Sequence, residues 1–509
     1  MSHYLAQISM KPAYYLFLSV FLFLFFPSLF AQDQPFSTFE YKKGKFATVY
    51  ALENDDPGEA LILVYQYKYS IEVIFLDEDL QFARKISPKY LPSPMVELDV
   101  EGIMNHNSYI YVFLDAGPYG STTEGNILQI NKADGSFHLI PLPLNPAMAE
   151  ELSEGKVKLL KVFQFQDRFY KLWIDTKSSE LYVFYFELGS NDVGLEQYQL
   201  SQDNIGKRLG RRQVFPTPLI TSYHDASLVS NAKLEKIYMF QDEMIISMEN
   251  QATGATELIS INTQTWEQVD EVYPVPAYIA FGEGQLFNSF LFDGFLYQLL
   301  KNTDGLTLSK VDFETKETVA QQKWVSKEAF NEDFSFQKMR KHNGSKLTVK
   351  DDPEIWKHLN ESLAVVLFPE GDQDRVMIGS HLYTDQATRD VLTVVSIAAS
   401  AASFASGYTT LWGGGGVSVS VNPFESINYA VDAILYFGQG RMFQADALLD
   451  HDSMLPSAEV NEAYKWDKIM EIMDVKEREI KMRSICLFQY REDVFLGYWK
   501  KKQYFLLKL

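Results

Sequence analysis

The side chains that could carry out acid–base chemistry in this 509-residue sequence are mainly carboxylates, 67 in number against 46 lysines and arginines. A glycoside hydrolase uses two carboxylates that flank the scissile bond, one as acid and one as base or nucleophile. Such a pair could be assembled from Asp115, Asp175 or Asp293, which are distant in sequence. Nothing in the sequence distinguishes these three from the other acidic residues, so the catalytic residues remain unassigned.

Two short acidic clusters carry the oxygen ligands that calcium prefers. Residues 77–79 are Asp-Glu-Asp, and residues 372–374 are Asp-Gln-Asp. A calcium loop of the EF-hand type also needs a glutamate further along, and neither cluster extends to that pattern. Asp side chains are equally typical of tight turns, where they accept hydrogen bonds from the nearby backbone. We therefore predict that both clusters are surface turns.

Histidine and cysteine form no recognisable metal or nucleophile motif. No two histidines stand at i, i+4, so a zinc site of the usual local spacing is not predicted. The single cysteine, Cys486, lies in an apolar run and is expected to be a small buried hydrophobe without a disulfide partner. The sequence also lacks a Gly-x-Ser-x-Gly elbow and a dinucleotide fingerprint. We predict neither a metal nor a cofactor. The histidines are His3, His106, His138, His224, His342, His358, His381 and His451.

The composition indicates a folded, β-rich protein. Charged residues make up 22% and hydrophobic residues 46% of the chain, as in packed globular proteins. Aromatic residues reach 14%, mostly Phe and Tyr, which favour strands. The formal net charge of −21 would repel phosphate backbones, so we predict no nucleic-acid partner.

Residues 1–31 have the three parts of a secretory signal peptide. Lys11 precedes an apolar run of 15 residues, 12–26, and Ala31 is a small residue suited to cleavage. The run is shorter than the roughly 20 residues of a membrane-spanning helix, although a retained anchor is the alternative. We predict cleavage near Ala31 and a secreted or periplasmic mature chain of residues 32–509, with a charge of −22 after the loss of Lys11.

Two short patterns recur along the mature chain. The first is an apolar strand, a tight polar turn and a second strand, as at 162–173, 237–247 and 290–299. In the last of these the turn is Asp293-Gly294, a pair that provides the positive φ of a two-residue hairpin. The pattern therefore predicts a series of β-hairpins.

The second pattern is an apolar strand that ends in Asn or Asp and usually has Asp or Thr three residues later. Its anchors, Asp77, Asn131, Asn262 and Asp312, are 54, 131 and 50 residues apart. Such side chains can close a turn on their own backbone. The long gap contains a predicted hairpin at 158–188, so it has room for at least one further unit.

A repeat of about 50 residues with three or four antiparallel strands resembles a β-propeller blade. The resemblance is to the superfold alone, because the Trp-Asp ending, the Ser-x-Asp-x-Gly-x-Thr-Trp box and the kelch double glycine are absent. It implies an all-β propeller of about seven blades over 32–509, closed by a last blade of four strands over 461–509. The alternatives are tandem β-sandwiches for the whole chain and a helix over 457–474 for the start of the last blade.

Residues 386–426 interrupt this pattern as an insertion in the penultimate blade, rich in Ala, Ser and Gly and uncharged from Val391 to Phe424. The favoured hypothesis is a structural insertion that packs against the body of the protein. A second hypothesis is membrane contact, which the many Ser, Thr and Gly residues disfavour. A third is that 417–421, which alternates Val and Ser, adds a strand to a partner's sheet.

Taken together, these features favour an exported, non-catalytic binding or scaffold protein that is monomeric and engages a protein or glycan partner. A carbohydrate-active enzyme is the first alternative, with its carboxylate pair at the central channel of the propeller. A membrane-contacting factor that acts through 386–426 is the second.

Overall fold

The structure is a computed structural model that describes most of the chain from residue 37 to residue 508. Residues 1–31, and all of 386–426 except 419–421, lie outside the described part, so the signal peptide and most of the insertion remain predictions. The described residues are 37–40, 48–54, 58–67, 70–88, 99–115, 126–141, 157–189, 192–200, 205–209, 217–221, 223, 228–278, 284–334, 336–343, 346–351, 354–359, 362–383, 419–421, 440–458, 460, 483–490, 493–500 and 503–508.

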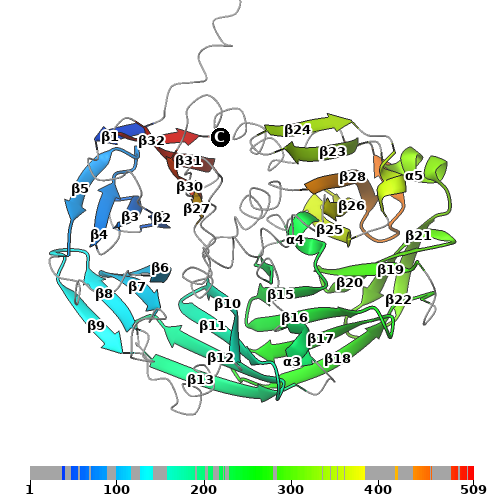
Figure 1. Cartoon of the computed structure of the whole chain (residues 1–509), viewed down its shortest axis with the longest axis horizontal. Coiled ribbons are helices and arrows are strands. Elements are labelled where there is room, and N and C mark those ends of the chain that lie inside the picture. Colours follow the sequence, from blue (N-terminus) through cyan, green and yellow to red (C-terminus); the bar gives the residue numbers. More distant parts are fainter. Residues whose placement is uncertain are drawn as a thin grey trace, which may run out of the picture.

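Seven sheets follow one another around a ring, so the chain is a seven-bladed β-propeller and not a pair of sandwiches (Figure 1). Both the superfold and the number of blades were predicted from the sequence repeat. The first three blades each contain four consecutive strands. They are β2 (Thr48–Glu53), β3 (Leu61–Tyr67), β4 (Ser70–Leu76) and β5 (Phe82–Ile86); β6 (Asp99–His106), β7 (Tyr109–Asp115), β8 (Asn126–Asn131) and β9 (Phe137–Pro141); and β10 (Val157–Phe165), β11 (Arg168–Asp175), β12 (Glu180–Glu187) and β13 (Asp192–Gln199).

The next two blades keep this plan, and blade four has an additional short strand, β14, parallel to its first long strand. Blade three occupies the long gap between Asn131 and Asn262 where the sequence predicted a further unit. The strands of blades four and five are β14 (Leu219–Ile220), β15 (Glu235–Phe240), β16 (Glu243–Asn250), β17 (Ala255–Asn262) and β18 (Gln268–Pro274); then β19 (Leu286–Phe292), β20 (Phe295–Asn302), β21 (Gly305–Asp312) and β22 (Thr318–Trp324).

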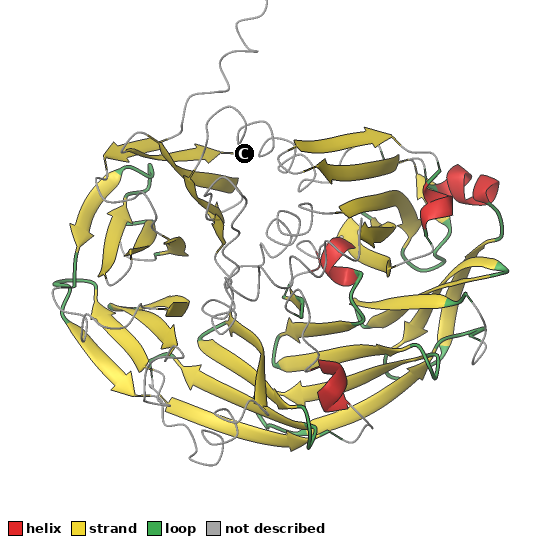
Figure 2. Cartoon of the chain, in the orientation of Figure 1, coloured by secondary structure: helices red, strands yellow, loops and turns green. Residues whose placement is uncertain are grey.

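Blade six is the most elaborate, and blade seven closes the ring. The strand order of blade six is β25 (Ser362–Glu370), β26 (Gln373–Tyr383), β28 (Gly440–Asp450), β23 (Phe336–Asn343) and β24 (Lys346–Asp351), with β29 (Pro456–Ala458) also paired to β28. The strand order of blade seven is β27 (Val419–Val421), β30 (Arg483–Tyr490), β31 (Asp493–Lys500), β32 (Gln503–Lys508) and β1 (Ser37–Glu40). Short helices stand between the strands (Figure 2): α3 (Ile205–Leu209), α4 (Leu228–Asn231), α5 (Lys327–Asp333) and the 3-10 turn η4 (Ile355–His358).

The two ends of the chain meet in blade seven. Its outermost strand is β1, whose Ser37 and Glu40 lie opposite Leu506 and Gln503 of β32. At the inner side of the ring, β30 contacts β2 of blade one. The sequence predicted four strands from the C-terminal region, and three of them are described as β30, β31 and β32. The first, at 468–475, lies outside the described residues, as does most of the alternative helix over 457–474. Strands β1 and β27 complete the described sheet. This arrangement covers the outer edge of β32, which would otherwise be an unpaired strand edge.

The insertion lies between β26 and β28 of blade six, and its described part pairs within the chain. Val419 and Val421 of β27 lie parallel to Ile485 and Leu487 of β30, and β27 also contacts β2. The hypothesis that this segment adds to a partner's sheet is therefore wrong for these three residues. An inner strand edge of blade seven was available to them, and pairing with it satisfies the backbone of both strands.

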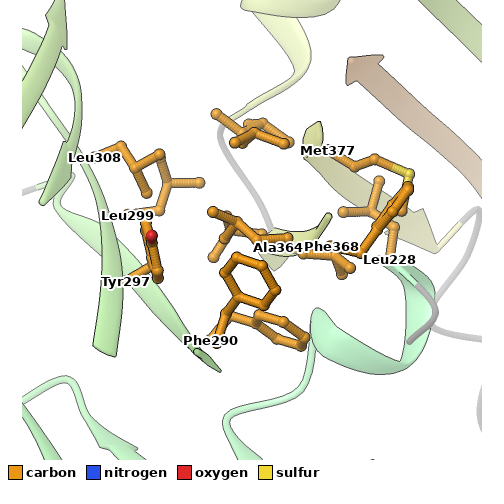
Figure 3. Close-up of a cluster of buried hydrophobic side chains, with 14 of the residues drawn as sticks. Leu228, Phe290, Tyr297, Leu299, Leu308, Ala364, Phe368 and Met377 are labelled. Atoms are coloured by element: carbon orange, nitrogen blue, oxygen red, sulfur yellow. The ribbon is translucent and has the colours of Figure 1, made fainter. Parts of the chain in front are cut away.

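Apolar side chains fill the interfaces between neighbouring blades. Between blades five and six, Phe290 and Leu299 lie opposite Ala364, Phe368 and Met377, and all five are buried (Figure 3). Each buried aromatic or large aliphatic side chain contributes about 1.5–3 kcal/mol relative to an exposed one. Blade packing therefore fixes the position of the polar turns that lie at the ends of the same strands.

The two sequence patterns meet at one end of blades two to five. The anchor Asn262 accepts hydrogen bonds from the backbone N–H groups of Gln264 and Thr265, both at 2.9 Å. The residue after the anchor, Thr263, donates its own N–H to the carbonyl of Asp242 in the first hairpin turn, at 2.7 Å. Lys132, Leu188 and Phe313 form the same bond to the first turns of their blades. The repeat seen in the sequence is therefore a hydrogen-bonded unit.

The carbonyl of the residue after the anchor also accepts a hydrogen bond from the preceding blade. The donor differs from one interface to the next, but the acceptor position is the same in four of them. The bonds are Arg84 to Lys132 (2.6 Å), Arg168 to Thr263 (2.6 Å), the Tyr273 hydroxyl to Phe313 (2.8 Å) and Lys310 to His451 (2.7 Å). In blades two, four and five, the residue after the anchor therefore joins the first turn of its own blade to the preceding blade. In blade six, His451 accepts the corresponding bond from blade five.

The anchor side chain should contribute measurably to stability. Asn262→Ala removes the acceptor of two backbone hydrogen bonds and should lower the free energy of unfolding by about 1–2 kcal/mol. Asn262→Asp is the matched control, because Asp312 accepts the corresponding bonds from Glu314 and Thr315 in blade five. Urea unfolding measures both variants. A loss in Asn262→Asp as large as that in Asn262→Ala would show that the side-chain oxygen is not the source of the stability.

Candidate functional site

Of the three carboxylates considered for a glycosidase pair, Asp293 lies apart from the other two. Asp115 ends β7 and Asp175 ends β11, whereas Asp293 lies in the turn between β19 and β20, at the opposite end of its blade. The buried Asp175 side chain accepts hydrogen bonds from the N–H groups of Lys177 and Ser178 at 2.7 and 3.2 Å, and so closes a turn. Of the three, Asp293 alone has a described side chain that is exposed and faces another titratable group.

The prediction that both acidic clusters are surface turns is confirmed for the first cluster and wrong for part of the second. Asp77 accepts hydrogen bonds from the N–H groups of Asp79 and Gln81 at 3.0 and 2.8 Å, which confirms the predicted surface turn. The second prediction is wrong for Asp374, which belongs to β26 and is 5% exposed. The turn there is only Gly371 and Asp372, with Gly371 at φ 67°, so the strand begins before Asp374 and carries its side chain into the protein.

Asp293 is placed by a tight hairpin. Asp293 and Gly294 both have positive φ, 50° and 76°, as predicted for this Asp-Gly pair. The backbone N–H of Asp293 donates to the hydroxyl of Tyr223 at 3.2 Å, while its side chain remains 64% exposed. The turn therefore presents a carboxylate at the surface of the interface between blades five and six.

His451 lies between two carboxylates from different blades. Its Nδ1 is 2.8 Å from Oδ2 of Asp374, and its Nε2 is 3.5 Å from Oδ2 of Asp293. The side chain of His451 is 37% exposed, and that of Asp374 is 7% exposed. Burial raises the pKa of Asp374 above its usual range, although His451 and Lys310 oppose this shift. The buried carboxylate fixes the orientation of the imidazole, and the other ring nitrogen faces the surface.

The ammonium of Lys310 contacts other groups than the carboxylates of Asp293 and Asp374. Its Nζ donates to the backbone carbonyl of His451 at 2.7 Å and lies 4.0 Å from the ring centroid of Phe295. Burial lowers the pKa of Lys310, while nearby carboxylates that include Asp374 and Asp452 oppose this shift. We call Asp293, Lys310, Asp374 and His451 the blade 5–6 site.

The charges of the blade 5–6 site act on the buried hydroxyl of Tyr297. The Tyr297 side chain is 1% exposed and packs in the apolar interface between the two blades (Figure 3). Its hydroxyl has no hydrogen-bond partner among the residues that the structure describes. Burial raises the pKa of Tyr297, and the charges of Asp374 and Asp293 raise it further. Both carboxylates therefore act electrostatically on this unpaired hydroxyl.

The blade 5–6 site combines an oriented imidazole with an exposed carboxylate. An imidazole oriented by a buried carboxylate resembles the base of a hydrolase triad. Among the described residues, however, neither nitrogen of His451 is hydrogen-bonded to a hydroxyl or thiol that could act as nucleophile. Within the same part of the chain, no three His, Cys, Asp or Glu side chains are grouped as metal ligands.

A second polar network, between blades four and five, is closed to solvent. Lys236 and Glu249 have fully buried side chains, and their Nζ and Oε1 atoms are 3.3 Å apart. Lys236 also donates to Asn288 at 2.7 Å, and Glu249 accepts from Ser289 and Thr256. Because nothing from outside can reach these groups, the network is structural.

Among the described helices, none is long and apolar enough to span a membrane.

His451 of the blade 5–6 site was not predicted from the sequence because Asp450 was not recognised as an anchor of the second pattern. His451 follows Asp450, which accepts hydrogen bonds from the N–H and hydroxyl of Ser453 at 2.8 and 2.7 Å and is therefore a further anchor of the second pattern. Recognition of that anchor would have placed His451 at the position that contacts the preceding blade.

The comparisons with known proteins identify no family for this chain. No family model and no curated protein matches the sequence. A solved prolyl endopeptidase matches 63% of this chain and 37% of its own, at 10% identity and a TM-score of 0.27. An oligogalacturonate lyase in complex with manganese matches 65% and 81%, at 9% identity and a TM-score of 0.25. A structure described as the Dos1 propeller matches 67% and 83%, at 8% identity and a TM-score of 0.26. This chain thus spans little more than a third of the endopeptidase, and the assignment of the fold rests on its own seven sheets.

Proposed function

We propose that this chain is an exported, non-catalytic binding or scaffold protein that holds a protein partner at the end of the propeller where the blade 5–6 site lies. The observation that carries the proposal is the pair of acceptors at that site, the exposed Asp293 carboxylate and Nε2 of His451, beside which the described residues place no hydrogen-bonded nucleophile. The negative net charge of −21 supports a partner with a basic surface, because it accelerates the approach of opposite charge.

The proposal is tested by immobilising the protein and its variants and measuring how much of each extracytoplasmic host protein they bind. Asp293→Asn and His451→Gln should each reduce retention of a specific partner by about tenfold, the usual scale for an interfacial charge pair. Asp304→Asn is the matched control. Asp304 is exposed in the turn between β20 and β21 of the same blade, at the opposite end from Asp293, and its replacement removes the same charge. Equal retention by all three variants would place the binding surface elsewhere.

Export is part of the proposal and is supported by the signal-like pattern of residues 1–31. Intact-mass measurement of the protein recovered outside the cytoplasm should give a chain that begins near Gln32. Recovery of the full-length chain in the cytoplasm would contradict export.

A further inference from the structure

His451 has a carboxylate oxygen beside each ring nitrogen, Oδ2 of Asp374 beside Nδ1 and Oδ2 of Asp293 beside Nε2. Asp374 accepts the hydrogen of Nδ1, so a neutral His451 carries only a lone pair on Nε2. That lone pair faces Oδ2 of Asp293 at 3.5 Å, and two acceptors at this distance repel each other. The repulsion is relieved either by a second proton on the imidazole or by an external donor that binds to both atoms.

The charge around Nε2 of His451 and the Asp293 carboxylate favours a positively charged donor. Asp293, Asp374, Asp450 and Asp452 all act electrostatically on Lys310. The ammonium of Lys310 is directed to the carbonyl of His451 and to the Phe295 ring, whereas the exposed Asp293 carboxylate lies 3.5 Å from Nε2 of His451. An incoming cation would therefore meet a net negative site.

The unpaired hydroxyl of Tyr297 is independent support for a bound group. A buried hydroxyl without a partner costs about 1–3 kcal/mol, and most buried polar groups in proteins are paired. Tyr297 is buried in the interface between the two blades, and the charges of Asp374 and Asp293 act on its hydroxyl. A ligand or a water held by a ligand at the site would provide the missing partner.

We propose that the blade 5–6 site binds the ε-ammonium group of a lysine side chain on a protein partner, which donates hydrogen bonds to Nε2 of His451 and to the carboxylate of Asp293. An ammonium has three donors and a compact charge on a long flexible stem, so it can reach a small opening and serve both acceptors. A neutral hydroxyl has one donor, and the planar fork of a guanidinium is wider. The proposal rests on the binding function proposed above and specifies the chemistry of the partner.

Protonation of His451 competes with this ligand. An imidazolium donates from Nε2 to Asp293 directly and adds a positive charge, so it removes the acceptor and repels the ammonium. The other groups that face His451 are Asp374 from β26, Lys310 from β21, and Asp450 and Asp452 from its own turn. Binding should therefore weaken as the pH is lowered.

The test uses the mature chain and Nα-acetyl-lysine methylamide as the probe, with the ring resonances of His451 followed by NMR. At pH 7.5 the probe should shift these resonances in a saturable manner, whereas the same compound with an acetylated ε-amine should not. Asp293→Asn should weaken binding by about tenfold, and Asp304→Asn should not weaken it. Glucosamine, a second source of an ammonium group, serves as the glycan arm.

Several outcomes would overturn the proposal. They are equal shifts with the charged and the acetylated probe, unchanged affinity in Asp293→Asn, or tighter binding at pH 5.5 than at pH 7.5. Saturable binding of glucosamine without binding of the lysine compound would overturn the protein ligand in favour of an amino sugar. If binding of a protein partner is weakened by Asp293→Asn while the lysine compound causes no shift of the His451 resonances, the proposed function holds and the lysine inference fails.

Discussion

Replacement of Glu249 by alanine should lower the free energy of unfolding by about 3–5 kcal/mol, the usual cost of leaving a buried charge without its partner. The side chains of Glu249 and Lys236 are both fully buried. The same carboxylate accepts hydrogen bonds from the hydroxyls of Ser289 and Thr256 at 2.5 and 2.9 Å. The alanine variant therefore leaves one buried ammonium and two buried hydroxyls poorly satisfied. The measurement is the shift of the urea midpoint at an unchanged slope.

Glu187→Ala is the matched control for this prediction. Glu187 pairs with Arg168 at 3.3 Å, the distance found between Glu249 and Lys236, but its side chain is 39% exposed. A half-exposed ion pair contributes about 0–1 kcal/mol, so this variant should be close to the wild type. Equal losses in the two variants would contradict the view that burial makes the Glu249 pair important.

The same network connects three blades. Lys236 of blade four donates to Asn288 of blade five at 2.7 Å, and Asn288 donates to the carbonyl of Leu363 in blade six at 2.7 Å. Replacement of both charged residues by methionine should recover much of the stability lost in Glu249→Ala, because no unpaired charge remains. The double variant would still lack the bond from Lys236 to Asn288 between blades four and five, whereas the bond from Asn288 to Leu363 between blades five and six would remain.

Local turn chemistry explains why the propeller could be predicted. A hairpin turn needs a residue that tolerates positive φ, and an Asn or Asp anchor needs backbone donors two or three residues later. Both requirements are met within a few residues, as at Asp293-Gly294 and Asn262. Because each blade repeats the same two turns, their spacing also indicated the number of blades.

The blade 5–6 site could not be predicted in the same way, since its members come from different units. Asp374 and His451 are 77 residues apart, and Asp293 belongs to the preceding blade. The Asp-Gln-Asp sequence at 372–374 is compatible with either an exposed turn or the start of a strand. Its burial depends on the exact length of one turn, which is two residues here. Such a site follows from the packing of blades, and composition does not reveal that packing.

Removal of strand β1 should destabilise the closing blade without unfolding the ring. A mature chain that begins at Tyr41 loses the four residue pairs that join Ser37–Glu40 to β32. At about 1 kcal/mol net for each hydrogen bond, the free energy of unfolding should fall by about 3 kcal/mol. The inner strand β30 still contacts β2, so blades seven and one should stay together. The urea midpoint measures the loss, and light scattering reports association through the newly unpaired edge of β32.

A chain that begins at Phe36 is the control, because it lacks everything before β1 but keeps the strand itself. It should unfold at the same urea concentration as the chain that begins near Gln32 and should remain monomeric. If the chains that begin at Phe36 and Tyr41 have the same midpoint, β1 does not stabilise the ring, and closure depends on the inner contacts of β30, β27 and β2. If the shorter chain loses far more than about 3 kcal/mol, the outer strand holds the whole closing blade in place, beyond the value of its own hydrogen bonds.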